Sequence, residues 1–193
     1  MSVSDRIRVN NVRLLSDDYY ILKTTSFEWR RANGEWHTQQ RETYERGNSA
    51  TVLPYHLGQR TVLLVRQFWY PAYVNDYDDL LIEAAAGMLD GASPEARIRA
   101  EAEEELGYRL GQVGKIFEAF MSPGSVTEKV HFFVAEYEPS MRINNGGGLA
   151  DEGEDIEVLE LPIDQALAMI VDGRIQDAKT IILLQYAALN IFN

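Results

Sequence analysis

Cysteine is absent from this chain of 193 residues. Its absence excludes disulfides, zinc–thiolate sites and thiol nucleophiles. Positive charge is scarce, because 18 Lys and Arg stand against 30 Asp and Glu and give a formal net charge of −12. A chain of this charge repels polyanions, so neither nucleic acid nor an anionic membrane is expected as a partner. An anionic substrate would need a divalent cation or a local Arg/Lys cluster to attract it.

A long hydrophobic segment is also missing. The most apolar run, residues 181–189, is too short to span a bilayer and contains Gln185. The first residues lack the apolar stretch of a signal peptide. The three histidines, His37, His56 and His131, show no metal-ligand spacing and are interpreted as structural. The sequence therefore predicts a soluble cytoplasmic protein.

The pattern of apolar residues predicts an N-terminal β arm followed by one mixed domain. Asn33-Gly34 favours a tight turn between strands at about 19–30 and 35–44, which indicates an antiparallel hairpin. We expect the arm to span residues 1–46 and the main domain residues 47–193. Within the main domain, the sequence predicts an α+β or mixed α/β/α architecture. The expected strands are 50–53, 61–68, 80–83, 113–120, 130–137 and 156–161, and the expected helices are 93–107, 162–171 and 177–189.

The helix at 93–107 carries an unusual concentration of negative charge at its C-terminal end. Ser93 and Pro94 are typical of a helix start, and Gly107 can end the helix in a left-handed conformation. Carboxylates in the last turns oppose the helix dipole and repel one another, by about 0.2–1 kcal/mol each. At 100° per residue, three of them share one arc and the fourth points nearly opposite. The pattern fits either a solvated acidic face or a site for a hard cation such as Mg²⁺. The carboxylates on the shared arc are Glu101, Glu104 and Glu105, and the one that points nearly opposite is Glu103.

Residues 87–108 resemble the Nudix box, G-x5-E-x7-R-E-U-x-E-E-x-G-U. Further segments are similar to the nucleoside-diphosphate-sugar branch of the Nudix hydrolases, and most of all to the bacterial GDP-mannose pyrophosphatases. The resemblance covers nearly the whole chain, including the arm. These segments are residues 44–48, 65–68, 121–128, 149–156, 157–162 and 179–184.

The box departs from the general pattern at three points. It is one residue shorter between Gly87 and Glu101, a spacing that the similar GDP-mannose enzymes share. Ser93 stands where the first Glu belongs. Ala100 stands where the pattern has the Arg that orients the catalytic Glu. Arg97, one helical turn before Glu101, is the candidate to take over that role.

The resemblance implies a Nudix fold, an α/β/α sandwich with a mixed sheet, and a Mg²⁺-dependent hydrolase for which Mn²⁺ can substitute. Water would attack one phosphorus of a substituted nucleoside diphosphate, with the metal neutralising the diphosphate. Glu104 would support the metal ligands and belongs with the catalytic candidates. The general base would be Glu152, with Glu128 as its rival. The implied metal ligands are the main-chain carbonyl of Ala86 and the side chains of Glu101, Glu105 and Glu154.

The resemblance also implies substrate contacts in both parts of the chain. Arg66 would bind the diphosphate; the alternative is that it only forms a surface ion pair. Lys179 would contact sugar or phosphate, unless it is merely a surface lysine at a helix start. In the family, the arm crosses to the partner subunit of a homodimer. The contacts implied for the arm are Tyr19, Gln40, Arg41 and Glu42, and those implied for the main domain are Arg66, Gly87, Met88 and Lys179.

Three functions remain open at this point. The first is hydrolysis of GDP-mannose to GMP and mannose 1-phosphate. The second is hydrolysis of ADP-ribose to AMP and ribose 5-phosphate, because residues 149–155 look like the catalytic loop of that branch. The third is a weakly active module that binds nucleotide sugars, suggested by Ser93 and Ala100. The tryptophans Trp29, Trp36 and Trp69 are interpreted as packing residues of the arm and interface.

Overall fold

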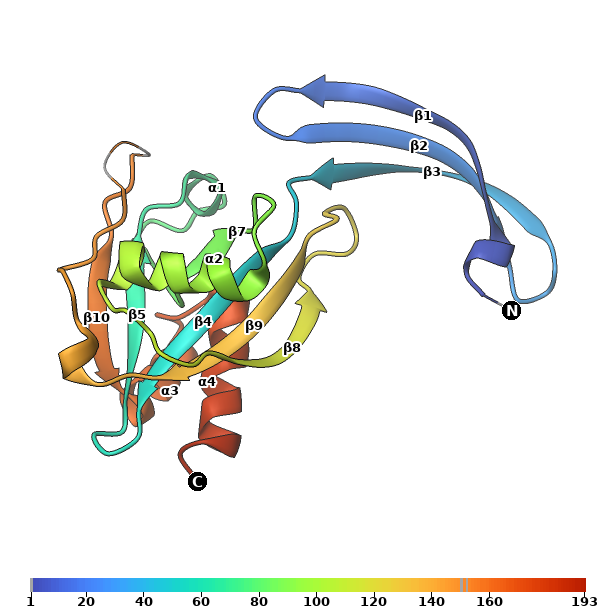
Figure 1. Cartoon of the computed structure of the whole chain (residues 1–193). Coiled ribbons are helices and arrows are strands. Elements are labelled where there is room, and N and C mark those ends of the chain that lie inside the picture. The colour runs from blue at the N-terminus through green and yellow to red at the C-terminus, as the bar shows by residue number, and fades with distance from the viewer. Residues whose placement is uncertain (1, 150, 152) are drawn as a thin grey trace. The chain divides into compact units, whose positions relative to one another are not determined.

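The structure, a computed structural model, describes every residue except 1, 150 and 152. It divides into two compact units (Figure 1). The first, here called the arm, comprises Met1–Asn48 and Phe120–Lys129. The second, here called the body, comprises Ser49–Ala119 and Val130–Asn193. Each unit is described by itself.

The arm contains an antiparallel sheet in the order β1-β2-β3, preceded by the short 3₁₀ helix η1. The predicted hairpin is confirmed, because β2 and β3 are joined by a turn that Arg31 N–H closes on Glu35 O at 2.8 Å. Gly34 adopts φ +91° in this turn, a conformation that favours glycine. The bounds are η1 Ser4–Arg6, β1 Ile7–Asp17, β2 Ile21–Arg30 and β3 Trp36–Glu45.

The strand β1 was not predicted from the sequence. Its register against β2 shifts between Val9 and Asn11 and again between Leu14 and Ser16. In a regular strand, successive side chains point to opposite faces, so apolar and polar residues alternate. Each register shift interrupts this alternation. The pattern of apolar residues therefore loses its period of two at the bulges.

The segment Phe120–Lys129 joins the arm although it lies far from it in sequence. Tyr44 N–H donates to Ser125 O at 2.8 Å, and Thr127 N–H donates to Tyr44 O at 3.2 Å. The side-chain oxygen of Asn48 accepts a further bond from Lys129 N–H at 2.9 Å. These bonds fix the end of β3 against a turn that precedes β9.

In the body, the described residues form a seven-stranded mixed sheet with the central order β10-β5-β4-β9-β8. Strands β4 and β9 run parallel over seven residue pairs, from Ser49↔Val130 to Tyr55↔Glu136. Strand β5 pairs antiparallel with both β4 and β10. The bounds are β4 Ser49–His56, β5 Thr61–Gln67, β6 Leu81–Glu83, β7 Ala86–Met88, β8 Gly114–Phe120, β9 Lys129–Glu136 and β10 Glu157–Pro162.

The sheet splits between β4 and β5. The two strands pair only at Tyr55↔Val62 and His56↔Thr61, next to the turn that joins them. Beyond that point β5 pairs with β6, and β4 pairs with β7. The link between β6 and β7, Ala84 and Ala85, is fully buried within the split. Small side chains suit this link because the surrounding elements leave little room for larger ones.

Helices cover both faces of this sheet, with α2 on one face and α3 and α4 on the other (Figure 1). Val52, Val65 and Phe133 belong to the core cluster that contains Ile98 of α2 and Ala102, the residue that follows α2. Together with the mixed sheet, this confirms the predicted α/β/α architecture. In the described part of the chain, no helix is long and apolar enough to cross a membrane. The bounds are α1 Tyr70–Tyr73, α2 Pro94–Glu101, the π-helical turn η2 Ala102–Leu106, the 3₁₀ helix η3 Pro139–Met141, α3 Ile163–Val171 and α4 Ala178–Asn190.

Both ends of the acidic helix have the predicted caps. The Ser93 hydroxyl accepts the Ala96 N–H at 3.3 Å, and Gly107 ends η2 with φ +78°. A Cβ atom at Gly107 would lie 2.5 Å from Asn144 O and 2.6 Å from Gly146 N, both backbone atoms. Glycine is therefore required at this helix end by both its conformation and its surroundings.

We predict that Gly107→Ala lowers the free energy of unfolding by about 1–3 kcal/mol, because alanine is strained at this φ and clashes with the backbone. Gly111→Ala is the matched control, since a Cβ atom added there would have no neighbour within 4 Å and its φ is not positive. That variant should change stability by less than about 1 kcal/mol. Urea unfolding followed by circular dichroism measures both. Equal effects of the two substitutions would contradict the role given to Gly107.

Candidate active site

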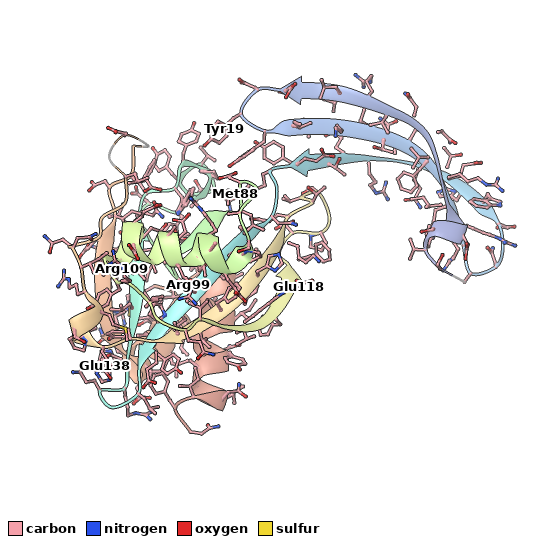
Figure 2. All side chains as sticks on the ribbon, viewed as in Figure 1. Tyr19, Met88, Arg99, Arg109, Glu118 and Glu138 are labelled. Atoms are coloured by element: carbon pink, nitrogen blue, oxygen red, sulfur yellow. The ribbon has the colours of Figure 1, made fainter. Side chains whose placement is uncertain are left out.

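The split in the sheet places β7 directly against the acidic helix. Ala86 N–H donates to Glu105 Oε2 at 3.3 Å. At the next residue, a Cβ on Gly87 would lie 1.5 Å from Glu101 Oε1 and 2.2 Å from its Cδ. Any side chain at Gly87 would displace the Glu101 carboxylate, so the first glycine of the box is needed for close approach. Met88, labelled in Figure 2, is the last residue of β7.

The loop that contains Gly146, Gly147 and Gly148, here called the glycine-rich loop, packs on the C-terminal end of the acidic helix. Gly147 N–H donates to Glu105 O at 3.0 Å, and Gly148 N–H donates to Glu104 O at 3.1 Å. These bonds satisfy carbonyl groups that a helix end leaves without partners. The same bonds hold Gly147 and Gly148 on the helix. A Cβ on Gly146 would lie 2.3 Å from Glu105 O, which explains why glycine is needed at the contact.

Glu101 is buried, with 6% of its side chain exposed, and its Oε1 lies 2.5 Å from Arg97 Nη2. Burial raises the pKa of Glu101 from the ordinary 4.5 to about 7. The charge of Arg97 opposes this shift, whereas the charges of Glu104 and Glu154 add to it. The contact between Arg97 and Glu101 is the one that Arg97 would need in order to orient Glu101. Ala100 cannot make such a contact, because it has no polar side chain.

Glu105 is more deeply buried than Glu101. Burial raises its pKa well above the ordinary value, and the charges of Glu101, Glu83 and Glu154 raise it further. Glu154 is held at the loop, where its Oε2 accepts Leu149 N–H at 2.8 Å. Glu103 pairs with Arg109 at 2.9 Å. It is not opposite Glu104 as the helical arc predicted, because residues 102–106 form a π-helical turn and both side chains border one cavity.

The donor set of these residues suits a hard divalent cation. All of its donors are oxygen atoms, namely buried carboxylates and the neighbouring Ala86 carbonyl. A divalent cation would offset the neighbouring negative charges that add to the effect of burial on the pKa values of Glu101 and Glu105. Among the residues that the structure describes, no three His, Asp or Glu side chains converge at metal-ligand distances. Glu101 is bonded to Arg97 and Glu154 to Leu149 N–H, so a cation would compete with these partners.

A cavity of about 430 Å³ lies beside the acidic helix. Ala100, Glu103 and Glu104 border it on the helix, and the glycine-rich loop forms the rest. Ala100, which stands where the Nudix box has an arginine, therefore borders open space that an arginine side chain would fill. The lining residues are Ala100, Glu103, Glu104, Asn144, Asn145, Gly146, Gly148 and Leu149.

Lys179 is not a surface lysine. Its ammonium group is bonded to Glu83 Oε2 and lies 3.0 Å from Asp177 Oδ1. Burial alone would lower the pKa of Lys179, but the charges of Glu83 and Asp177 outweigh burial and raise it. Glu83 also accepts the indole N–H of Trp69, which we had interpreted only as a packing residue. Sequence analysis missed Glu83, because a single glutamate at the end of a short strand carries no spacing signal.

Arg66 forms a surface ion pair, which was the alternative to the expected contact with the diphosphate. Its Nη2 lies 2.5 Å from Glu157 Oε2, and both side chains are partly exposed. The pair joins neighbouring strands, since Arg66 is on β5 and Glu157 is opposite it on β10. Exposed ion pairs contribute little to stability, about 0–1 kcal/mol. Arg66 can therefore exchange this partner for an anionic ligand at small cost.

The remaining expected site residues lie in the arm, apart from Glu152, which is outside the described residues. Tyr19 lies at the turn between β1 and β2 with 85% of its surface exposed (Figure 2). Gln40 donates to Thr24 Oγ1 at 3.0 Å, and Arg41 donates to Gln40 O at 2.8 Å. Gln40 and Glu42 share one face of β3, with Arg41 on the other. Glu128 belongs to the segment that joins the arm, and its Oε1 lies 3.9 Å from Arg46 Nε.

Comparison with known proteins finds relatives over nearly the whole chain. The family described as the GDP-mannose pyrophosphatase NudK N-terminal domain matches residues 6–44. A GDP-mannose pyrophosphatase of Pectobacterium atrosepticum is 53% identical over 186 residues, 96% of this chain and 95% of that protein. Another, of Klebsiella pneumoniae, is 52% identical over 95% of this chain and 92% of that protein. A crystal structure of an ADP compounds hydrolase has a TM-score of 0.71 at 17% identity, covers 95% of this chain and 93% of that chain, and shows the shared fold.

The raised pKa of Glu101 predicts how the stability of the metal-free chain depends on pH. Between pH 4.5 and about 7, the folded chain keeps a proton on Glu101 that the unfolded chain has lost. Rising pH therefore favours the unfolded state, and the contribution of Glu101 is lost as pH passes about 7.

We predict that Glu101→Gln removes this contribution, so that the loss of stability between pH 5 and 8 becomes about 2–3 kcal/mol smaller. Urea unfolding with a chelator present, at pH 5 and pH 8, measures the difference. Glu103→Gln is the control, because Glu103 is partly exposed and its pKa is lowered, mainly by the hydrogen bond from Arg109. The same pH dependence in the Glu101 variant and the unsubstituted chain would contradict the assignment.

Proposed function

The chain belongs to the GDP-mannose pyrophosphatase family of the Nudix hydrolases, and we propose that it hydrolyses the diphosphate bond of GDP-mannose to GMP and mannose 1-phosphate. The observation that carries this proposal is identity of about 50% with such enzymes over about 95% of the chain. The match includes the arm, which would form part of the substrate site. The donor set at the split of the sheet supports the same reaction, because it suits the divalent cation that Nudix hydrolases require.

We propose Mg²⁺ as the cation, held by the Ala86 carbonyl and by Glu101, Glu105 and Glu154, with Glu104 in support. When bound, Mg²⁺ neutralises the diphosphate and lowers the pKa of the attacking water. Gly87 leaves room for the Glu101 carboxylate, and Arg97 orients it in place of the arginine missing at position 100. The proton of the attacking water would pass to Glu152 or to Glu128.

Three cationic or polar groups of the body would bind the substrate. Arg66 would leave Glu157 and present its guanidinium fork to the diphosphate, a geometry that matches phosphate oxygens. Lys179 keeps its charge despite burial and would contact sugar or phosphate. The backbone of Gly87 and Met88 would border the phosphates at β7.

We propose that the chain is a homodimer in which the arm of one subunit completes the site of the other. Tyr19 supports this, because an aromatic side chain this exposed can stack on a base. Gln40, Arg41 and Glu42 would add polar contacts from β3. The apolar side chains Val9, Val12 and Leu14 of β1 are also exposed and would gain from a covering partner.

Hydrolysis of ADP-ribose is the second candidate function. The feature that favours it is the acidic loop at residues 149–155, which resembles the catalytic loop of the ADP-ribose branch. The third candidate, a weakly active module that binds nucleotide sugars, rests on Ser93 and Ala100. Arg97 weakens this third reading, because it supplies the contact to Glu101 that Ala100 cannot make.

We predict that, with Mg²⁺ present, kcat/KM for GDP-mannose exceeds that for ADP-ribose at least tenfold, about 1.4 kcal/mol in the transition state. Parallel assays with identification of the products measure this ratio. Glu101→Gln should lower kcat for both substrates by about 10²–10³, as expected when electrostatic stabilisation is lost. A preference for ADP-ribose would establish the second candidate, and full activity of the Glu101 variant would refute the metal assignment.

We also predict that deletion of residues 1–44 gives a monomer with kcat/KM lowered at least tenfold, because the site loses the contacts of the partner's arm. Sedimentation and steady-state kinetics measure the two effects. Tyr19→Ala in the full chain is the matched variant, since it should stay dimeric while KM rises. A truncated chain with full activity would refute the shared site.

A further inference from the structure

Four arginines gather at the end of the arm where η1 meets the turn between β2 and β3, near the N-terminus in Figure 1. Arg6 ends η1, and its Nε and Nη2 donate to Arg30 O at 3.0 Å and 2.7 Å. Arg30 Nε donates in turn to Gly34 O at 3.2 Å. Arg31 follows directly in the turn, and Arg8 lies on β1 two residues after Arg6. These four residues are here called the arginine cluster.

Three members of the arginine cluster line one cavity. Its volume is about 270 Å³, and the turn residues Ala32 and Gly34 complete its wall. All of the lining residues belong to the arm, so the arm forms this cavity by itself. Sites for drug-sized ligands occupy about 300–1,000 Å³, so this cavity suits a smaller ligand. The three lining arginines are Arg6, Arg30 and Arg31.

No member of the arginine cluster has a carboxylate partner within the part of the chain that the structure describes. The guanidinium groups of Arg6 and Arg8 lie over the rings of Trp29 and Trp36, at 4.4 Å and 3.8 Å from the ring centroids. Such contacts with a ring leave the positive charge in place. Arg31 makes no side-chain hydrogen bond or ion pair with any described residue.

Carboxylates are present at this end of the arm, but they have other partners. Asp5 Oδ2 accepts the backbone N–H three residues earlier in the chain at 2.8 Å. Glu35 Oε2 accepts the side-chain N–H of Asn33 at 2.8 Å. Glu28 stands opposite Arg8 in the register of β1 and β2, and no ion pair joins these two described residues. The positive charge of the cluster is therefore left without a neutralising partner.

The arginines of the body are paired differently. Among the described residues, five of its seven arginines form an ion pair with a carboxylate. Carboxylates are abundant in this chain, with 30 Asp and Glu against 18 Lys and Arg. Neighbouring guanidinium groups without such partners repel one another, and an anion bound among them would remove this repulsion. The five paired arginines are Arg60, Arg66, Arg97, Arg109 and Arg174.

We propose that the arginine cluster is a binding site for a small phosphate-bearing anion, either inorganic phosphate or a phosphate monoester, whose phosphate group is held by Arg6, Arg30 and Arg31. A guanidinium group presents its N–H donors in a planar fork that matches phosphate oxygens. Arg31 offers its whole fork, whereas Arg6 and Arg30 each use part of theirs on a backbone carbonyl. The site goes beyond the proposed function and does not rest on it.

The first experiment titrates the full chain with inorganic phosphate by calorimetry, with a chelator present so that no cation joins phosphate to the carboxylates of the body. Arg31→Gln should weaken phosphate binding about tenfold, because charge-assisted hydrogen bonds are lost. Arg13→Gln is the matched control, because Arg13 is another exposed arginine of the arm that does not line the cavity. Its affinity should change less than about twofold. Absence of binding to the unsubstituted chain, or equal losses in the two variants, would overturn the proposal.

A third variant tests whether phosphate binds in the body instead. Arg66→Gln removes the arginine proposed to bind the diphosphate of the substrate, and it should leave phosphate affinity within about twofold. A loss of affinity in Arg66→Gln without a loss in Arg31→Gln would overturn the proposal. Arg31 is exposed in a turn, so we expect its substitution to leave the fold intact, which circular dichroism checks.

The second experiment identifies the source of the phosphate group. It titrates the same variants with GMP and with mannose 1-phosphate, the two monoesters that the proposed function would release. Inorganic phosphate that binds as tightly as both monoesters would identify the bare anion as the ligand. A monoester that binds about tenfold more tightly would identify that monoester instead. The preferred anion must bind more weakly to Arg31→Gln, and an unchanged affinity would overturn the proposal.

Steady-state kinetics and sedimentation test two other uses of the arginine cluster. Without added phosphate, kcat/KM of Arg31→Gln for GDP-mannose should stay within about twofold of the unsubstituted chain. A tenfold loss would place Arg31 in the substrate site and overturn the proposal. Dissociation of Arg31→Gln into monomers that bind phosphate normally would assign the cluster to a contact with a second copy, and would also overturn it. Calorimetry does not depend on turnover, so failure of the proposed function and failure of this inference can be told apart.

Discussion

Mutual repulsion between buried carboxylates is the constraint on which the body of this protein depends. Glu101 and Glu105 are buried next to each other, and Glu83, Glu104 and Glu154 add negative charge around them. A helix selected for stability alone would not place these residues at its C-terminal end. The chain compensates in part with Arg97 on Glu101 and Lys179 on Glu83. The negative charge that remains uncompensated is the basis of the cation site that we propose.

The split sheet determines where this charge collects. Because β4 and β5 separate after two residue pairs, the short strands β6 and β7 enter between them and bring Ala86 and Gly87 to the helix. The link is fixed from the opposite side of the sheet, where Thr180 of α4 binds Ala84 N–H. The glycine-rich loop closes the other side through its bonds to the carbonyls of Glu104 and Glu105. The site is thus set by backbone contacts before any ligand is present.

Arg97 makes the contact to Glu101 that the departure from the family pattern at Ala100 would otherwise remove. The box places an arginine directly before the first metal-binding glutamate, whereas this chain has Ala100 there. Residues four apart lie on one face of a helix, so Arg97 reaches Glu101 from the preceding turn. The space next to Ala100 stays open and forms part of the cavity. The contact to Glu101 is retained although the position that supplies it has changed.

The sequence by itself determined most helices and strands of the body, the caps of the acidic helix, the Asn33-Gly34 hairpin and the family, but it missed β7 and the short helix α1. The features that it determined depend on residues close together in the chain, so spacing and turn residues are enough to recognise them. Strand β1 was missed because its bulges break the alternation of side chains. Only the tertiary structure decided that Phe120–Lys129 joins the arm, that Lys179 is buried against Glu83, and that Arg66 pairs with Glu157. Those contacts join residues about 80 or more positions apart, and no local pattern encodes them, because they arise only when the sheet and helices pack.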